Sequence, residues 1–418
     1  MLSMRVKLFA SHAQFALFLA FLVSIFFIRL GFLYLEYKEF IAKPFYYTNA
    51  ELIEHYVKNQ KTVLRLHSDD LDMNFVSLTN KPIEEGITYL RVKLYPNAKI
   101  SFGEYLGLSL ISLDIKEQFI EKNFKLQLED SIAFQHDDAL IASFHKGIFL
   151  ATSMIKPLRE SVATLGISHI ITLSGFHLSI IWGVSYFLLL YPYRFFQKKN
   201  FPHRLALLDV GFVVLFVLGL FVWFVDYPAP LVRSYGMVSI GWMMVLMGFE
   251  LISFEFLFAI TFISLMFFPK FIVHLGFWFS VLGVFYIFLI AKWFEKLPKI
   301  YIFLLVESLV FFFMMPIVNL FFGNVSLAFL FSPILSAIFI VYYPLTIFMH
   351  LIGWGDFLDF GLKSLIYHSF KPTTINLSWI LGVAYILLSL ASMFSKKIFY
   401  ALIGVALAYG ALVFVVMV

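Results

Sequence analysis

The chain contains no cysteine, which excludes disulfides, thiolate metal sites and cysteine nucleophiles. Charge is also scarce, since Asp, Glu, Lys and Arg make up only 14% of the 418 residues, whereas soluble proteins carry about a quarter. No Gly-x-x-x-x-Gly-Lys-Ser/Thr segment occurs, so no P-loop is predicted and motive force must come from a partner or a gradient. We expect no cofactor and no metal ion.

Apolar residues dominate instead, at 61% of the chain, and they fall in repeated runs near 20 residues. A helix of that length crosses a hydrocarbon core of about 30 Å, so the fold class predicted is a polytopic α-helical membrane protein. The first run covers residues 9–30 and follows Arg5 and Lys7. It is too long for the core of a cleaved signal peptide, and residues 1–35 are therefore predicted to be a retained membrane anchor.

Residues 36–115 form a polar region in which apolar and polar residues alternate. Thr88, Leu90, Val92 and Leu94 alternate with Tyr89, Arg91 and Lys93, as in a half-buried strand. We expect strands at 62–67, 75–78, 87–94 and 105–113. Several short strands separated by turns favour a small extracytoplasmic β-barrel, and an OB-like domain is predicted here.

Residues 116–165 include a helical pattern. Apolar residues recur at steps of three and four between Leu140 and Leu158, while His145 and Lys146 lie off this stripe. The pattern predicts an amphipathic helix in the membrane interface, with packing on the β domain as the alternative. His136-Asp137-Asp138 resembles a fragment of a metal site, but we interpret the aspartates as a helix cap, and Pro157 should kink or end the helix.

Residues 166–418 are predicted to be a membrane domain of eight or nine spans. The apolar runs lie near 168–191, 205–225, 231–248, 254–268, 274–291, 300–322, 327–350, 374–394 and 398–418. Lysine and arginine in loops 192–204 and 292–299 place those loops and the N-terminus in the cytoplasm, so residues 36–160 should lie outside it. Lys396-Lys397 would lie outside the cytoplasm if the spans alternate strictly, which disagrees with this charge rule. A re-entrant segment at 351–371, or a number of spans that is wrong by one, would explain the disagreement.

One span opens with an unusual polar cluster that includes His169, Ser174 and His177. Polar side chains are costly in hydrocarbon, so a functional role is the first interpretation, and a buried histidine bonded to a carbonyl is the alternative. Gly175, Ser179 and Gly183 recur every four residues and predict close helix packing, whereas Ser174, His177 and Ser185 form a separate polar edge.

Two further segments carry chemistry. Asp226-Tyr-Pro228-Ala-Pro230-Leu-Val-Arg233 predicts an outward turn entering a span, in which Arg233 would bind a phosphate, pair with Asp226 or extend toward the membrane edge. Gly276-Phe277-Trp-Phe-Ser280 predicts tight packing at a helix start. Glu307 lies within a span that also holds Asn319, so its carboxyl must be protonated, paired or hydrated.

Taken together, these segments resemble the ComEC family of competence proteins. Gly166-Ile-Ser-His169-Ile-Ile-Thr-Leu-Ser174-Gly175-Phe-His177 is similar to its G-x-x-H-x-x-x-x-S-G-x-H signature, and Pro228–Ser234 and Gly276–Ser280 are similar to two later motifs. The family's asparagine-rich segment is replaced around Ser332-Pro333-Ile-Leu-Ser336, and no His-x-His-x-Asp-His run of a metallo-β-lactamase-like domain occurs. The resemblance implies an inner-membrane channel through which single-stranded DNA enters the cytoplasm during natural transformation.

The implied partners are single-stranded DNA, a periplasmic DNA-binding receptor and membrane lipids, while a cytoplasmic translocase and a homodimer stay open. Residues 51–130 hold thirteen acidic and ten basic residues, which argues against strong non-specific DNA binding there. The alternatives are a secondary transporter or lipid-linked glycan exporter, and an intramembrane hydrolase using Ser174 and His177. No internal repeat supports a transporter, and no third group orients the serine–histidine pair.

Overall fold

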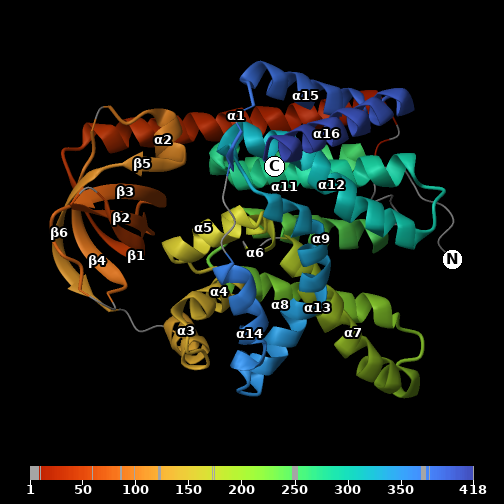
Figure 1. Ribbon diagram of the computed structural model, residues 1–418, viewed down its shortest axis with the longest axis horizontal. Coiled ribbons are helices and arrows are strands. Elements are labelled where there is room, and N and C mark those ends of the chain that lie inside the picture. The colour runs from red at the N-terminus through yellow and green to blue at the C-terminus, as the bar shows by residue number, and fades with distance from the viewer. Residues whose placement is uncertain are drawn as a thin grey trace. The chain divides into compact units, whose positions relative to one another are not determined.

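The computed structural model describes residues 9, 11–58, 60–84, 87–97, 99–120, 124–171, 173, 175–246, 253–368, 373–375 and 377–417. Most of these residues are helical, and they divide into two compact units (Figure 1). The β unit comprises residues 11–131 and 262–275, and the helical unit comprises residues 132–261 and 276–418.

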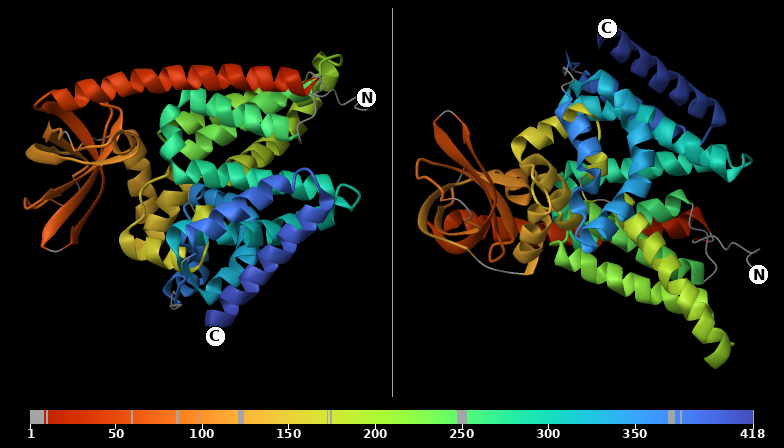
Figure 2. Two further views of the ribbon diagram at one scale, coloured as in Figure 1. Left: turned by 90° about the horizontal axis from the view of Figure 1, so that it is seen from above. Right: turned by 60° about the horizontal axis from the view of Figure 1, so that its bottom comes forward.

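The β unit begins with a long apolar helix, α1 (His12–Ala42). The side chain of Ser11 accepts a hydrogen bond from the backbone N–H of Gln14 and so caps its first turn. The helix is long and apolar enough to cross a membrane, which agrees with the predicted anchor. It continues past the predicted boundary at residue 35, and Figure 2 shows it as one unbroken helix that ends at the sheet.

Six strands form one open sheet in the order β5-β3-β2-β1-β4-β6. They are β1 (Tyr46–Lys58), β2 (Lys61–Ser68), β3 (Met73–Thr79), β4 (Tyr89–Tyr95), β5 (Leu108–Leu110) and β6 (Ser112–Phe119). The predicted OB-like barrel is therefore wrong in one respect, because the sheet does not close. The edge strand β5 has only three residues and pairs with β3, whereas β6 pairs with β4, so the two edges form no ladder with each other.

The predicted strands at 62–67, 75–78 and 87–94 are confirmed as β2, β3 and β4. The stretch at 105–113 is not one strand. It contains the end of helix α2 (Phe102–Leu106), then β5 and the start of β6. A capping box between Ser101 and Glu104 starts this helix, and such a reciprocal pair of hydrogen bonds favours a helical turn over a strand.

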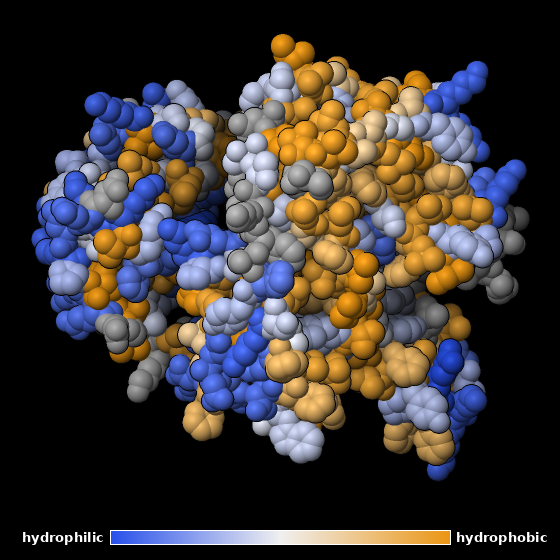
Figure 3. Space-filling view, viewed as in Figure 1, coloured by the Kyte–Doolittle hydropathy of each residue, from blue (hydrophilic) through white to orange (hydrophobic). Residues whose placement is uncertain are grey.

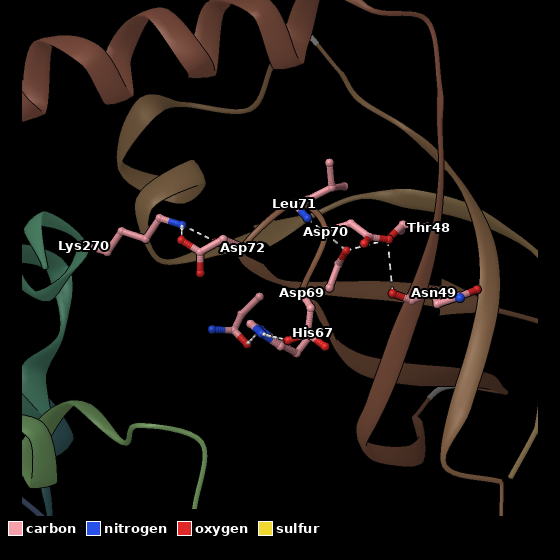
Figure 4. A network of polar contacts seen from close by, with 10 residues as sticks. Thr48, Asn49, His67, Asp69, Asp70, Leu71, Asp72 and Lys270 are labelled. Carbon is pink, nitrogen blue, oxygen red and sulfur yellow. Dashed lines mark hydrogen bonds and ion pairs between the residues drawn. The ribbon is translucent and has the colours of Figure 1, made fainter. Parts of the chain in front are cut away.

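Alternating strand residues build the core of the β unit, in which Leu64, Leu66 and Phe75 are fully buried. Tyr37 from α1 joins this core and donates a 2.7 Å hydrogen bond to the carbonyl of Ile100. A polar network lies at the β2–β3 turn (Figure 4). There Thr48 bonds Ser68 and Asp70, and Lys270, from the short helix η1 (Pro269–Val273), binds Asp72.

The helical unit contains most of the apolar helices. They are α4 (Ala139–Leu150), α5 (Lys156–Thr164), α6 (Ser168–Ile171), α7 (Gly175–Asn200), α8 (Ala206–Phe224), α9 (Ala229–Leu246), α11 (Leu275–Trp293), α12 (Lys299–Phe322), α13 (Ser332–Leu351), α14 (Asp359–Tyr367), α15 (Trp379–Ala391) and α16 (Lys396–Met417). Helix α3 (Phe124–Phe134) precedes them, and α10 (Phe254–Phe267) links the two units. Apolar side chains are exposed over this unit (Figure 3).

Among the described residues, six helices are long and apolar enough to span a membrane. Besides α1, these are Gly175–Asn200, Leu275–Trp293, Lys299–Phe322, Leu327–Leu351 and Lys396–Val416. The predicted spans near 205–225, 254–268 and 374–394 form shorter apolar helices, and the span near 231–248 corresponds to α9. In the described part of the segment at 351–371, which ends at residue 368, the structure has the end of α13 and the short helices η3 (Gly355–Leu358) and α14. The re-entrant arrangement of this segment stays a prediction.

The predicted amphipathic helix is instead two helices. Asp138 caps α4, as expected, by accepting hydrogen bonds from the N–H groups of Leu140 and Ile141. The helix ends where Ala151 adopts a left-handed conformation with φ of 58°, and Pro157 begins α5 rather than ending a helix. Most of α4 is buried within the helical unit, including His145. The position of this helix relative to a membrane stays a prediction.

Candidate functional site

The three sequence motifs meet around one buried arginine of the helical unit. Arg233 lies on α9, the first residue of α7 is Gly175, and Ser280 lies on α11. A strained turn leads into α9, because Asp226 and Tyr227 both have positive φ angles, of 62° and 52°. The carbonyl of Pro228 then accepts hydrogen bonds from Leu231 and Val232 and starts the helix.

Arg233 is only 3% exposed, and its described partners are neutral. Nη2 donates to Ser234 Oγ at 2.9 Å and also to Ser280 Oγ, while Nη1 donates to the sulfur of Met237. No acceptor for Nε is found among the described residues. The guanidinium is therefore enclosed by protein side chains, and Asp226 is not among its described partners.

Gly175 allows α7 and α9 to approach closely. A Cβ built on this residue would lie 2.7 Å from the Cβ of Ser234, which is closer than two carbon atoms can pack. The predicted packing row along α7 does not continue beyond this point. Ser179 is exposed and bonds its own helix at the Gly175 carbonyl, and a Cβ on Gly183 would meet nothing within 4 Å.

His177 is fully buried and packs against aromatic rings of α13. Its ring lies 4.7 Å from that of Tyr343 in a perpendicular arrangement and 5.2 Å from that of Phe339. The imidazole therefore lies in a packed contact between helices in this conformation. Ser174, its proposed neighbour, lies outside the described residues.

The other predicted residues have separate positions. His169, on α6, is exposed, and its Nε2 lies 3.4 Å from Ser336 Oγ on α13. Gly276 is exposed near the start of α11, whereas Phe277 beside it is fully buried. Glu307 is partly buried on α12, and no described contact joins it to Arg233. On the same helix, Asn319 donates a 3.0 Å hydrogen bond to Tyr409 of α16.

A histidine cluster in the helical unit was not predicted. His136, His145 and His350 come together with Asp359, although His136 and His350 are 214 positions apart in the chain. Burial, followed by the neighbouring His136 and His350, lowers the pKa of His145 to about 2. Only the His136-Asp137-Asp138 run pointed toward this cluster, because spacing in sequence cannot show that α4 lies against the end of α13.

The comparisons agree with the motifs. A family model described as Competence protein matches residues 151–418, which include the segments of His177, Arg233 and Ser280. No curated protein and no solved structure matches the chain. The candidate spans indicate a multi-pass membrane protein. Because the family model covers more than half of the sequence and the three motifs meet at one junction, the chain belongs to the ComEC family of competence proteins.

Proposed function

We propose that this chain forms the route by which single-stranded DNA crosses the cytoplasmic membrane during natural transformation. Membership of the competence family gives it a role in DNA uptake. The observation that carries the finer proposal is the buried Arg233, whose described partners are two hydroxyls and a thioether. A cation without a carboxylate partner attracts a phosphate, and a DNA strand brings one negative charge per nucleotide.

The proposal requires helices α7 and α9 to separate near Arg233. In this conformation α7 and α9 touch at Gly175 and Ser234, and His177 is covered by Phe339 and Tyr343. Water and a nucleotide would reach Arg233 only after these helices separate. We therefore assign the described arrangement to a closed state in which the hydroxyls of Ser234 and Ser280 hold the guanidinium until a phosphate replaces them.

We further propose the orientation and partners. The N-terminus faces the cytoplasm and residues 36–160 face outward, where the β domain receives DNA from a periplasmic DNA-binding receptor. Its acidic excess favours a protein partner over direct binding of DNA. Transport without a nucleotide-binding loop leaves the driving force to a cytoplasmic translocase or to a gradient. We propose a transport role rather than an enzymatic one.

An uptake assay with labelled DNA tests the function. A strain that lacks the chain should accumulate label outside the cytoplasmic membrane and none inside it, and the intact gene should restore entry. Label that reaches the cytoplasm at the normal rate in the deletion strain would refute a conduit. Loss of envelope glycan with normal transformation would instead favour the exporter.

Two substitutions at His177 separate packing from chemistry. His177→Phe keeps an aromatic ring between Phe339 and Tyr343, whereas His177→Ala leaves a cavity there. If the imidazole takes part in transport, both variants lose DNA entry while the protein stays in the membrane at normal levels. Normal entry with the phenylalanine variant would reduce the role of His177 to packing.

A further inference from the structure

The histidine cluster has a regular pattern of hydrogen bonds. The Nδ1 atom of His145 lies 3.0 Å from the carbonyl oxygen of Ile141, and Nδ1 of His350 lies 2.7 Å from that of Thr346. Nδ1 of His136 lies 3.0 Å from a carboxylate oxygen of Asp359. Carbonyl and carboxylate oxygens only accept hydrogen bonds, so Nδ1 carries the proton in all three rings.

On neutral rings this assignment leaves all three Nε2 atoms unprotonated, so that each lone pair can accept a hydrogen bond or bind a metal ion. A histidine that donates its other ring N–H to a carbonyl or carboxylate is the usual arrangement of a metal ligand, because the hydrogen bond fixes the tautomer and the ring orientation. One ring nitrogen from each histidine lies within 4.8 Å of the other two. The cluster therefore has both the ligand type and the supporting contacts of a metal site.

Two of these lone pairs face each other at short range. Nε2 of His136 and Nε2 of His350 are 3.0 Å apart, and His136 is buried. Two acceptors at that distance repel each other unless a cation lies between or beside them. We infer that His136, His145 and His350 bind a divalent transition-metal ion, with Zn²⁺ the best match to neutral imidazole ligands.

The spacing fits a tetrahedral ion. Zn–N bonds of 2.0–2.1 Å place two ligand nitrogens of a tetrahedral ion about 3.3 Å apart. The ligand nitrogens of the three histidines all lie within 4.8 Å of one another, so the distance between any two of them has to shorten by no more than about 1.5 Å when the ion binds. Tyr342, whose hydroxyl lies 3.0 Å from Nε2 of His145, is within reach as a fourth ligand or as a hydrogen-bond partner of a bound water. Magnesium and calcium are excluded because they prefer oxygen ligands.

The site would hold together segments that are far apart in the sequence. His136 precedes α4, His350 lies at the end of the candidate span Leu327–Leu351, and Asp359 begins α14. Gln135 already joins these segments, because its side chain bonds the backbone at His350 and Gly355. The metal therefore has a structural role in the helical unit, and this inference does not depend on DNA transport.

Metal analysis of the purified full-length protein tests the site. Tag-free protein in detergent is loaded with Zn²⁺ and dialysed, and the metal that stays bound is measured by mass spectrometry. In a second sample Co²⁺ takes the place of Zn²⁺, because the visible spectrum of Co²⁺ reports the geometry of its ligands. The absence of cysteine removes any thiolate background. We expect about one ion per chain, with its loss in His136→Ala and His350→Gln.

The matched control is His203→Ala, which removes an exposed histidine of the same chain and should leave one ion bound. Asp359→Asn should weaken binding by about 10- to 100-fold, because it removes the carboxylate that orients His136. Folded wild-type protein that binds neither Zn²⁺ nor Co²⁺ would overturn the inference. A proton shared between the Nε2 atoms of His136 and His350 would then account for their short separation. Retention of the ion by the His350 and His136 variants would overturn it as well.

Discussion

A methyl group added at Gly175 should separate α7 from α9. In Gly175→Ala the new carbon would lie 2.7 Å from the Cβ of Ser234, whereas carbon atoms pack at about 3.5–4.0 Å. The helices must therefore move apart by about 1 Å at this point. Overpacking of this kind costs about 1–3 kcal/mol. Because Gly175 is the first residue of α7, alanine gains little of its usual advantage in a helix interior.

Thermal unfolding in detergent, followed by tryptophan fluorescence, measures this cost. Gly183→Ala is the matched control, since it lies on the same helix and its Cβ would meet nothing within 4 Å. The double variant Gly175→Ala with Ser234→Gly restores the missing space, so its loss should be smaller than the sum of the two single losses. If Gly175→Ala is as stable as the control, or if the two substitutions are simply additive, the close-approach argument is wrong.

Three further predictions follow from the same structure. Arg233→Lys should keep part of the transformation frequency and Arg233→Ala none, because lysine retains the positive charge but not the guanidinium that donates to Ser234 and Ser280. Equal transformation frequencies for the two variants would contradict an electrostatic role of Arg233. Asp138→Ala should lower stability by about 1 kcal/mol, measured by the same unfolding assay, because α4 loses its cap. With free Zn²⁺ at a hundred times its dissociation constant, the bound ion should raise the free energy of unfolding of the wild-type protein by about 2.7 kcal/mol, and a chelator should remove this gain. The free energy of unfolding of His350→Gln should not change when the chelator is added.

Local patterns were enough to predict several elements. Alternation identified β2, β3 and β4, and long apolar runs identified the helices that could span a membrane. The closure of the sheet was predicted wrongly because it depends on whether distant strands pair, which alternation does not encode. The longest strand, β1, was missed, and a capping box at Ser101 turned part of an expected strand into helix.

The candidate site was predictable only in part. The three motifs named Gly175, Arg233 and Ser280, but only the structure shows that their helices meet and that the arginine is buried. The sequence could not show that two aromatic rings of α13 pack against His177, because those residues lie more than 160 positions further along the chain. His145 was placed on the polar side of an isolated helix, whereas α4 is enclosed by its neighbours and has almost no polar side.

The length of α1 has a mechanical consequence. Its 31 residues extend about 46 Å, but a hydrocarbon core of about 30 Å takes up only about 20 of them. A membrane-spanning α1 would therefore leave about a third of its length outside the hydrocarbon, and Tyr37 and Phe40 near its end belong to the core of the β unit. Only residues 43–45 separate the helix from β1, so no flexible hinge intervenes. A change in the tilt of α1 would therefore be passed directly to the sheet.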